Sequence, residues 1–125
     1  MSSFPPDKLL IFWELDWFFD SWEEHLLTDG DLASLQFLIM HNPHAGPVMT
    51  GTDGLRKLRF SPKSWNTGKS HALRVCYVYF EKYGHVLLCL VFRKGELDNL
   101  SAAGKQAVNK AIERIEIALE RRYGF

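Results

Sequence analysis

GTDGLRKLRFSPKSWNTGKSHALR, residues 51–74, is the stretch around which the rest of the chain is organised. It opens with a glycine-rich turn, continues as the strand-like segment LRKLRF and enters a second strand at Leu73 after a polar loop. It carries six lysines and arginines but a single acidic residue, Asp53. The stretch therefore predicts two consecutive strands that are joined by a polar loop and rich in positive charge.

Alternation along the first of these strands separates its apolar side chains from its basic ones. Successive residues of a strand point to opposite faces of a sheet. We therefore expect Leu58 and Phe60 to be buried on one face. Lys57 and Arg59 should then lie together on the opposite, more solvated face. Two cations on an open face attract an anion, and phosphate is the commonest biological anion.

The segments before this stretch predict a strand and then two helices. Residues 9–14, LLIFWE, form a short apolar run typical of a strand. A helix is expected from Asp16, its candidate cap, to about Leu27, with its apolar stripe facing the core. That stripe consists of Phe18, Phe19, Trp22 and Leu26.

A second helix is expected from about Asp31 to His41, after a capping turn at residues 28–31. It ends at Asn42 because the residue before Pro43 is pushed out of the helical region. Its apolar stripe consists of Leu32, Leu35, Leu38 and Ile39. With so short a turn between them, the two helices should form a hairpin.

Two further strands and a last helix follow the basic stretch. Residues 72–82 are β-branched and aromatic, and a turn containing Gly84 joins them to the continuously apolar run VLLCLVF at 86–92. That run predicts a central strand buried on both faces. A helix with Ser101 as its N-cap should run to Arg122, with Val108, Ala111, Ile112, Ile115 and Leu119 as its stripe.

This order of elements predicts an α+β fold within a single domain, residues 1–125. About four strands should form a mainly antiparallel sheet, with the helices segregated on one face. Residues 1–7 are expected to be a loose arm. No apolar run reaches the roughly 18–20 residues needed to span a bilayer, and the first residues do not resemble a signal peptide.

The cysteines and histidines offer little sign of a metal or redox site. Cys76 and Cys89 both lie in apolar runs, which favours small buried side chains in a reducing compartment over a disulfide or a catalytic thiol. His41 and His44 have no neighbouring cysteine and no regular ligand spacing. We therefore expect no metal and no other cofactor.

Charge is unevenly distributed along a chain whose net charge is zero. Residues 1–50 have a balance of −7, residues 51–100 of +5 and residues 101–125 of +2. Such segregation favours an anionic partner for one face. The alternative is that acidic helices simply balance basic strands across the fold.

A basic cluster can be assembled on the open face of the expected sheet. Lys57 and Arg59 would come from one strand and Arg74 from the next, and Arg93 or Lys94 from the end of the following strand. Meandering strands would bring these side chains within reach of a single phosphate. The sequence contains no conspicuous carboxylate pair, Ser-His-Asp set or phosphate-binding P-loop. Proton transfer would fall to a lysine crowded by other cations, or to His71.

Several short motifs resemble the RelE/HigB-like toxins of bacterial type II toxin–antitoxin systems. They are GTDGLRKLRF, ALRVCYVYF, VFRKGELDNLS and the NPxxG pattern at residues 42–46, in the order and spacing of that family. The resemblance implies a RelE-like, microbial-ribonuclease-like fold and a cytoplasmic, metal-independent endoribonuclease that cleaves mRNA on the ribosome. It also implies a cognate helix-turn-helix antitoxin, contact with DNA only through that antitoxin, and no membrane partner.

The resemblance implies roles for particular residues. The catalytic set carried over from the family motifs is Lys57, Arg59, Arg74 and Lys94. Further RNA-binding candidates are Arg56, Lys63, Lys69, His71 and Arg93. The chain departs from the family in having no tyrosine between residues 95 and 100, and in its neutral net charge.

The implied reaction uses a group that DNA lacks. The RNA 2′-OH attacks its adjacent phosphate while Lys57 or His71 removes the proton, and Arg59 and Arg74 stabilise the charge that develops. Two alternatives stay open at this point. The protein could be a non-catalytic module of the same fold that binds RNA, or one whose basic face serves only to dock an acidic antitoxin.

Overall fold

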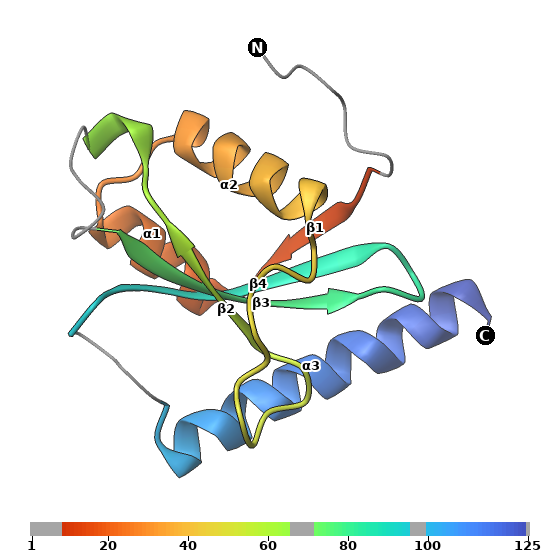
Figure 1. Cartoon of the computed structure of the whole chain (residues 1–125). Helices are drawn as coiled ribbons and strands as arrows, with labels where there is room; N and C mark the ends of the chain where they lie inside the picture. Colours follow the sequence, from red (N-terminus) through yellow and green to blue (C-terminus); the bar gives the residue numbers. More distant parts are fainter. Residues whose placement is uncertain (1–8, 66–71, 96–99, 125) are drawn as a thin grey trace.

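The computed structural model describes residues 9–65, 72–95 and 100–124 and has an α+β fold (Figure 1). The expected arm at residues 1–7 lies outside the described residues. Three helices, four strands and one short 3-10 turn follow each other in the described part of the chain. In order they are β1 Ile11–Glu14, α1 Asp16–Glu24, α2 Asp29–His41, β2 Arg56–Phe60, the 3-10 turn Lys63–Trp65, β3 Leu73–Phe80, β4 His85–Arg93 and α3 Ala102–Tyr123.

The four strands form one mixed sheet in the order β1-β4-β3-β2. The expected meander is confirmed, because β2 pairs antiparallel with β3 and β3 antiparallel with β4. β1 instead lies parallel to β4, with Ile11 opposite His85. The two helices that follow β1 return the chain to the far edge of the sheet, where β2 begins.

The helices cover both faces of the sheet, so the expectation that they share one face is wrong. α1 and α2 pack on the face that carries Val75 and Tyr77. α3 packs on the face that carries Cys76 and Val78, opposite α2 (Figure 1). The cause lies in β3 and β4, whose side chains are apolar and mostly buried on both faces. A strand of this kind needs a layer on each side.

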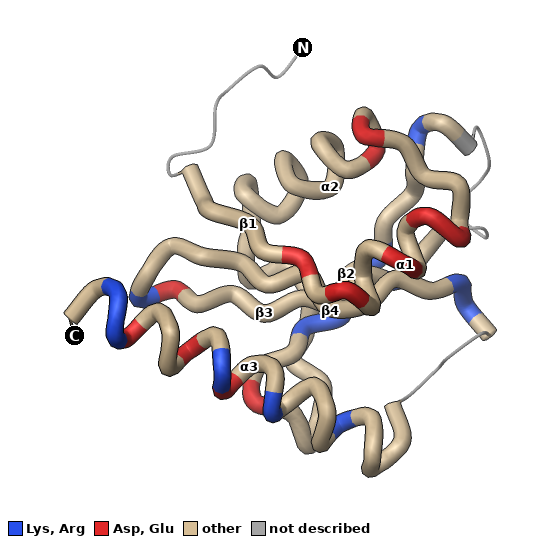
Figure 2. Tube along the Cα trace, turned by 180° about the vertical axis from the view of Figure 1, so that it is seen from behind, with Lys and Arg blue, Asp and Glu red and all other residues tan. Residues whose placement is uncertain are grey.

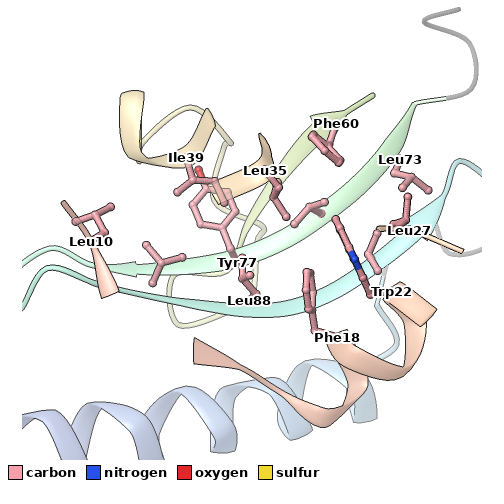
Figure 3. Close-up of a cluster of buried hydrophobic side chains, with 13 residues drawn as sticks. Leu10, Phe18, Trp22, Leu27, Leu35, Ile39, Phe60, Leu73, Tyr77 and Leu88 are labelled. Carbon is pink, nitrogen blue, oxygen red and sulfur yellow. The ribbon is translucent and has the colours of Figure 1, made fainter. Parts of the chain in front are cut away.

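The core under α1 and α2 combines aliphatic side chains with a smaller number of aromatic ones (Figure 3). Phe18 is fully buried and stacks on Trp22 with ring centroids 5.3 Å apart, and Trp22 in turn stacks on Phe60 of β2. Leu35 and Ile39 of α2 are also fully buried here. The expected stripes are only partly correct. Phe19, Leu26 and Leu38 are all exposed.

A second core lies under α3. Val108, Ile112 and Leu119 of this helix are buried against Cys76 and Cys89, among other side chains of the sheet. Both cysteines are free. Burial raises the pKa of the Cys76 thiol to about 12, despite the opposing effect of the Lys57 charge. A thiol with so high a pKa is a packing group and not a nucleophile at neutral pH.

The helix caps follow the expected chemistry at two of three sites. Asp16 is not a cap, because Leu15 occupies the N-cap position of α1 and Asp16 is the first helical residue. α2 begins at Asp29, two residues earlier than expected, because Thr28 forms a capping box with Asp31. Ser101 caps α3 as expected, its Oγ accepting a hydrogen bond from the Gly104 amide at 3.0 Å.

Asp31 also ties α2 to the 3-10 turn that follows β2. Its carboxylate accepts hydrogen bonds from the Thr28 amide and from the hydroxyl and amide of Ser64. Burial alone would raise the pKa of Asp31, but these hydrogen bonds outweigh it and the pKa is lowered. The expected polar loop after β2 therefore contains a short ordered turn that the sequence did not suggest.

A buried histidine ties the first strand to the end of the last helix. Trp13 Nε1 of β1 donates a hydrogen bond to His85 Nδ1 at 2.7 Å, and His85 Nε2 lies 2.8 Å from the Tyr123 hydroxyl. Because an indole N–H can only donate, Nδ1 is unprotonated and Nε2 carries the ring hydrogen. Burial, together with the nearby charge of Arg122, lowers the pKa of His85.

Candidate active site

Two arginines face each other across β2 and β3. Arg59 lies directly opposite Arg74, and Lys57 lies opposite Cys76. Opposed residues of an antiparallel pair have Cβ atoms about 4.5–5.5 Å apart and point to the same face. Arg59, Arg74 and Lys57 therefore share the α3 face of the sheet. Like charges placed directly opposite each other destabilise a sheet, so an anion bound between them would be favourable.

The expected separation of apolar and basic side chains on β2 is confirmed in its main point. Phe60 is buried and Leu58 is half-buried against the core under α1 and α2. Arg59 is exposed and Lys57 is half-buried. The face on which they lie is not the open face that we expected, because the α3 core occupies part of it. The basic side chains lie on the β2 and β3 part of that face.

Arg93 and Lys94 separate at the end of β4. Arg93 pairs with Leu73, whose side chain belongs to the core under α1 and α2, so Arg93 belongs to that face and not to the face of Arg74. Lys94 follows in the turn after the strand and is exposed. Of the two candidates for the last cation of the site, the register therefore favours Lys94.

The remaining candidates lie elsewhere. The guanidinium of Arg56 donates hydrogen bonds to the carbonyl oxygens of His44 and Gly46, at 3.3 and 2.8 Å. This holds the loop before β2, which is a structural role. Lys63 is exposed in the 3-10 turn. Ser64, the next residue of that turn, forms a hydrogen bond with Asp31 of α2. Two further candidates, Lys69 and His71, lie outside the described residues.

The NPxxG segment, residues 42–46, fixes the backbone of Lys57. The buried Tyr77 hydroxyl donates to the Pro43 carbonyl at 2.8 Å and accepts from the Gly46 amide at 3.3 Å. Gly46 is so close to β2 that a Cβ there would lie 2.7 Å from the Lys57 carbonyl oxygen. The Lys57 amide also donates to the Pro47 carbonyl at 3.1 Å. Lys57 is thus held between β3 and this loop.

The GTDG turn, residues 51–54, is docked on α3. Gly51 and Gly54 have φ values of +82° and +107°, in the region that favours glycine. The Asn109 side chain donates to the Gly51 carbonyl at 3.2 Å and accepts from the Asp53 amide at 2.9 Å. One amide group therefore clamps both sides of the turn. This contact joins residues more than fifty positions apart, and no local sequence pattern indicates it.

A cavity of about 250 Å³ separates β2 from the first turns of α3. Its described lining contains two lysines and no carboxylate, and it consists of Pro47, Val48, Met49, Thr50, Lys57 and Lys105. Lys105 was not among the residues expected from the sequence. The only sign of it is its i, i+4 spacing to Asn109, which places both on one face of α3.

A second cavity, of about 410 Å³, lies further along α3 beside the turn between β3 and β4. Its described lining is mainly acidic and aromatic, with Glu81, Glu116 and Glu120 among its carboxylates. Figure 2 shows acidic residues on α1 and at the start of α2, whereas lysines and arginines lie on β2 and after β4. Among the described basic residues in the middle of the chain, Lys57, Arg59 and Arg74 share one face of the sheet, whereas Lys63, Lys82 and Arg93 lie elsewhere.

No known protein-family model matches this chain. Among the described residues, no group of three or more His, Cys, Asp or Glu side chains is placed to hold a metal ion. In that same part of the chain, no helix is both long and apolar enough to cross a membrane. Function therefore has to be inferred from the geometry of the residues themselves.

Proposed function

We propose that the protein is the toxin of a toxin–antitoxin system and a metal-independent endoribonuclease that cleaves mRNA. The observation that carries this proposal is the Arg59–Arg74 pair, with Lys57 two residues away on the same face. Such an arrangement costs stability in the empty protein and becomes favourable when a phosphodiester lies between the guanidinium groups. The mixed sheet, with two helices before β2 and one after β4, is compatible with a RelE-like fold.

The chemistry begins at the ribose. The 2′ oxygen attacks the adjacent phosphorus while Lys57, acting through its neutral amine, accepts the 2′ proton. The bond between phosphorus and the 5′ oxygen then breaks, and Lys94 donates a proton to the leaving oxygen. The products are a 2′,3′-cyclic phosphate and a free 5′-OH, so all atoms and protons balance. Arg59 and Arg74 bind the two non-bridging oxygens and stabilise their developing charge.

The rest of the molecule holds these groups in place. Gly46 and Pro47 fix the Lys57 backbone on one side, and β3 fixes it on the other. Such rigid support matters because misplacing a catalytic group by about 1 Å can cost about 100-fold in rate. In this proposal the protein acts in the cytoplasm on ribosome-bound mRNA and is neutralised by a cognate helix-turn-helix antitoxin.

A second candidate function is RNA binding without cleavage, or docking of the antitoxin alone. One observation favours it. The described lining of the cavity beside Lys57 contains two lysines but no carboxylate and no histidine, so proton transfer there would rest on lysine. Analysis of the RNA after incubation separates the two candidates, because binding leaves the RNA intact.

The test is cleavage of mRNA in a reconstituted translation mixture, with purified protein. Wild-type protein should yield fragments that end in a 2′,3′-cyclic or 3′ phosphate. Arg74→Gln and Lys57→Met should lose this activity. Arg114→Gln, which removes an exposed charge from α3, serves as the matched control and should cleave normally. If wild-type protein leaves the RNA intact, the proposal that it is a nuclease is rejected and the non-catalytic binding function is retained.

A further inference from the structure

The cavity between β2 and α3 brings together two lysines that are far apart in the sequence. Lys57 lies on β2 and Lys105 near the start of α3, and both are half-buried. The Thr50 side chain also lines this cavity. A volume of about 250 Å³ is below the range of about 300–1,000 Å³ typical of sites for drug-sized ligands. It suits a group of the size of a phosphate.

Lys105 is held at this cavity by the GTDG turn. A Cβ on Gly51 would lie 3.4 Å from both Cδ and Nζ of Lys105, so glycine leaves the space through which the lysine side chain runs. Asn109, one helical turn later, clamps the same GTDG turn. The lysine therefore approaches the cavity over a fixed surface. It loses less conformational entropy on binding than a fully solvated lysine would.

We infer that Lys105, at the cavity that it shares with Lys57, binds a second RNA phosphate, the neighbour of the phosphate that is cleaved. This inference rests on the proposed function, and it adds α3 to the RNA-binding surface. Lys57 and Arg59 are two residues apart on one strand, a distance of about 6.5 Å. That spacing is comparable to the distance between adjacent phosphates of an extended RNA strand. One phosphate at the arginine pair and the next at Lys105, across the cavity from Lys57, would fix the register of the RNA strand.

The test is a binding measurement on short single-stranded RNA with 2′-O-methyl groups, which lack the attacking hydroxyl and so cannot be cleaved. Each lost phosphate contact lowers the slope of log K against log salt by about 0.7 for single strands. Lys105→Gln should lower the slope by about this amount and weaken binding by about tenfold. Lys105→Arg should restore both. Lys110→Gln, which removes an exposed charge from the same helix, should leave both unchanged.

The outcomes separate this inference from the nuclease proposal. Wild-type protein that cleaves mRNA, with a salt slope that Lys105→Gln does not alter, overturns the inference and leaves the nuclease. Protein that does not cleave, but whose RNA binding depends on Lys105, keeps the phosphate site and overturns the nuclease. Circular dichroism melting of each variant shows whether it is folded, and the recovery in Lys105→Arg guards against a structural explanation.

Free phosphate is the other possible source of the same ligand chemistry. Inorganic phosphate added to the protein should shift the amide NMR signals of Thr50 and Gly51 only at millimolar concentration, whereas the methylated RNA should shift them at micromolar concentration. Tight binding of inorganic phosphate without binding of RNA would overturn the assignment of this cavity to an RNA phosphate.

Discussion

The two faces of the sheet differ in what covers them. On one face α1 and α2 bury a core of aliphatic and aromatic side chains in which Phe18 and Tyr77 are fully inaccessible to solvent. On the other face the apolar stripe of α3 covers Cys76 and Cys89, and the basic side chains lie next to this core on β2 and β3. Both faces thus carry a buried core, whereas the candidate chemistry lies on the second face alone.

Strand alternation is what makes this division possible. In β2 the side chains of Leu58 and Phe60 belong to the core of the first face, whereas Lys57 and Arg59 belong to the second. A single five-residue strand therefore serves both purposes. A substitution of Leu58 or Phe60 should therefore change stability with little effect on activity. A substitution of Lys57 or Arg59 should change activity with little effect on stability.

The largest expected effect is on the core under α1 and α2. Phe18→Ala should lower the free energy of unfolding by about 3–5 kcal/mol, because Phe18 is fully buried and stacked on Trp22. Phe19→Ala is the matched control, since the neighbouring ring is 46% exposed, and should cost far less. Urea denaturation of both variants measures the difference. Equal losses of unfolding free energy in the two variants would show that the buried ring of Phe18, in the core under α1, is not a main source of stability.

The next largest effect is on activity. Arg59→Gln should lower the cleavage rate by about 10²–10³-fold, which corresponds to about 2.7–4 kcal/mol of lost transition-state stabilisation. Its free energy of unfolding should stay the same or rise slightly, because the repulsion from Arg74 is removed. Single-turnover cleavage and urea denaturation are the two measurements. A variant that unfolds easily but cleaves normally when folded would reverse the comparison.

A smaller effect is expected where the NPxxG segment meets β2. Gly46→Ala should destabilise the protein by about 1–3 kcal/mol and slow cleavage, because the new methyl group would collide with the Lys57 carbonyl. Gly30→Ala is the control. A Cβ there meets its nearest atom at an ordinary 3.6 Å, so this change in α2 should stabilise by about 0.5–1 kcal/mol. Thermal melting distinguishes the two signs, and a neutral Gly46→Ala would contradict the close approach.

The smallest expected effect is a dependence of stability on pH at the His85 site. The lowered pKa of His85 means that the unfolded chain takes up this proton at a higher pH than the folded protein does. The contribution of neutral His85 to the free energy of unfolding is complete above the ordinary pKa of 6.5. It falls as the pH drops below 6.5 and stops falling once the pH is below the pKa of the folded protein. His85→Gln should remove this slope, and His41→Gln, which changes an exposed ring, should not. Denaturation at a series of pH values measures both.

Much of the fold could be predicted because its signals are local. The alternation of LRKLRF, the stripe of α3 and its Ser101 cap all depend on neighbouring residues. The prediction that all helices share one face of the sheet was wrong, although the sequence contained evidence against it. A run as apolar as VLLCLVF requires cover on both faces, which is incompatible with helices on one face alone.

The candidate site could be predicted in part. The pairing of Arg59 with Arg74 follows from a simple antiparallel register between neighbouring strands. The separation of Arg93 from this pair depends on which face the end of β4 presents, and that is set by the register of a third strand. Lys105 and Asn109 were missed because their contacts cross from α3 to a loop far away in sequence.

The parallel pairing of β1 with β4 has a consequence for how the chain folds during synthesis. Ile11 lies opposite His85, so the partner of the first strand is translated more than seventy residues after it. At about 5–20 residues per second, the first strand waits for roughly 4–15 seconds before its partner exists. The β2-β3 hairpin can form in that interval, and β4 then pairs with β3 as it is translated. The first strand then joins an assembled sheet, so its docking is a late step in co-translational folding.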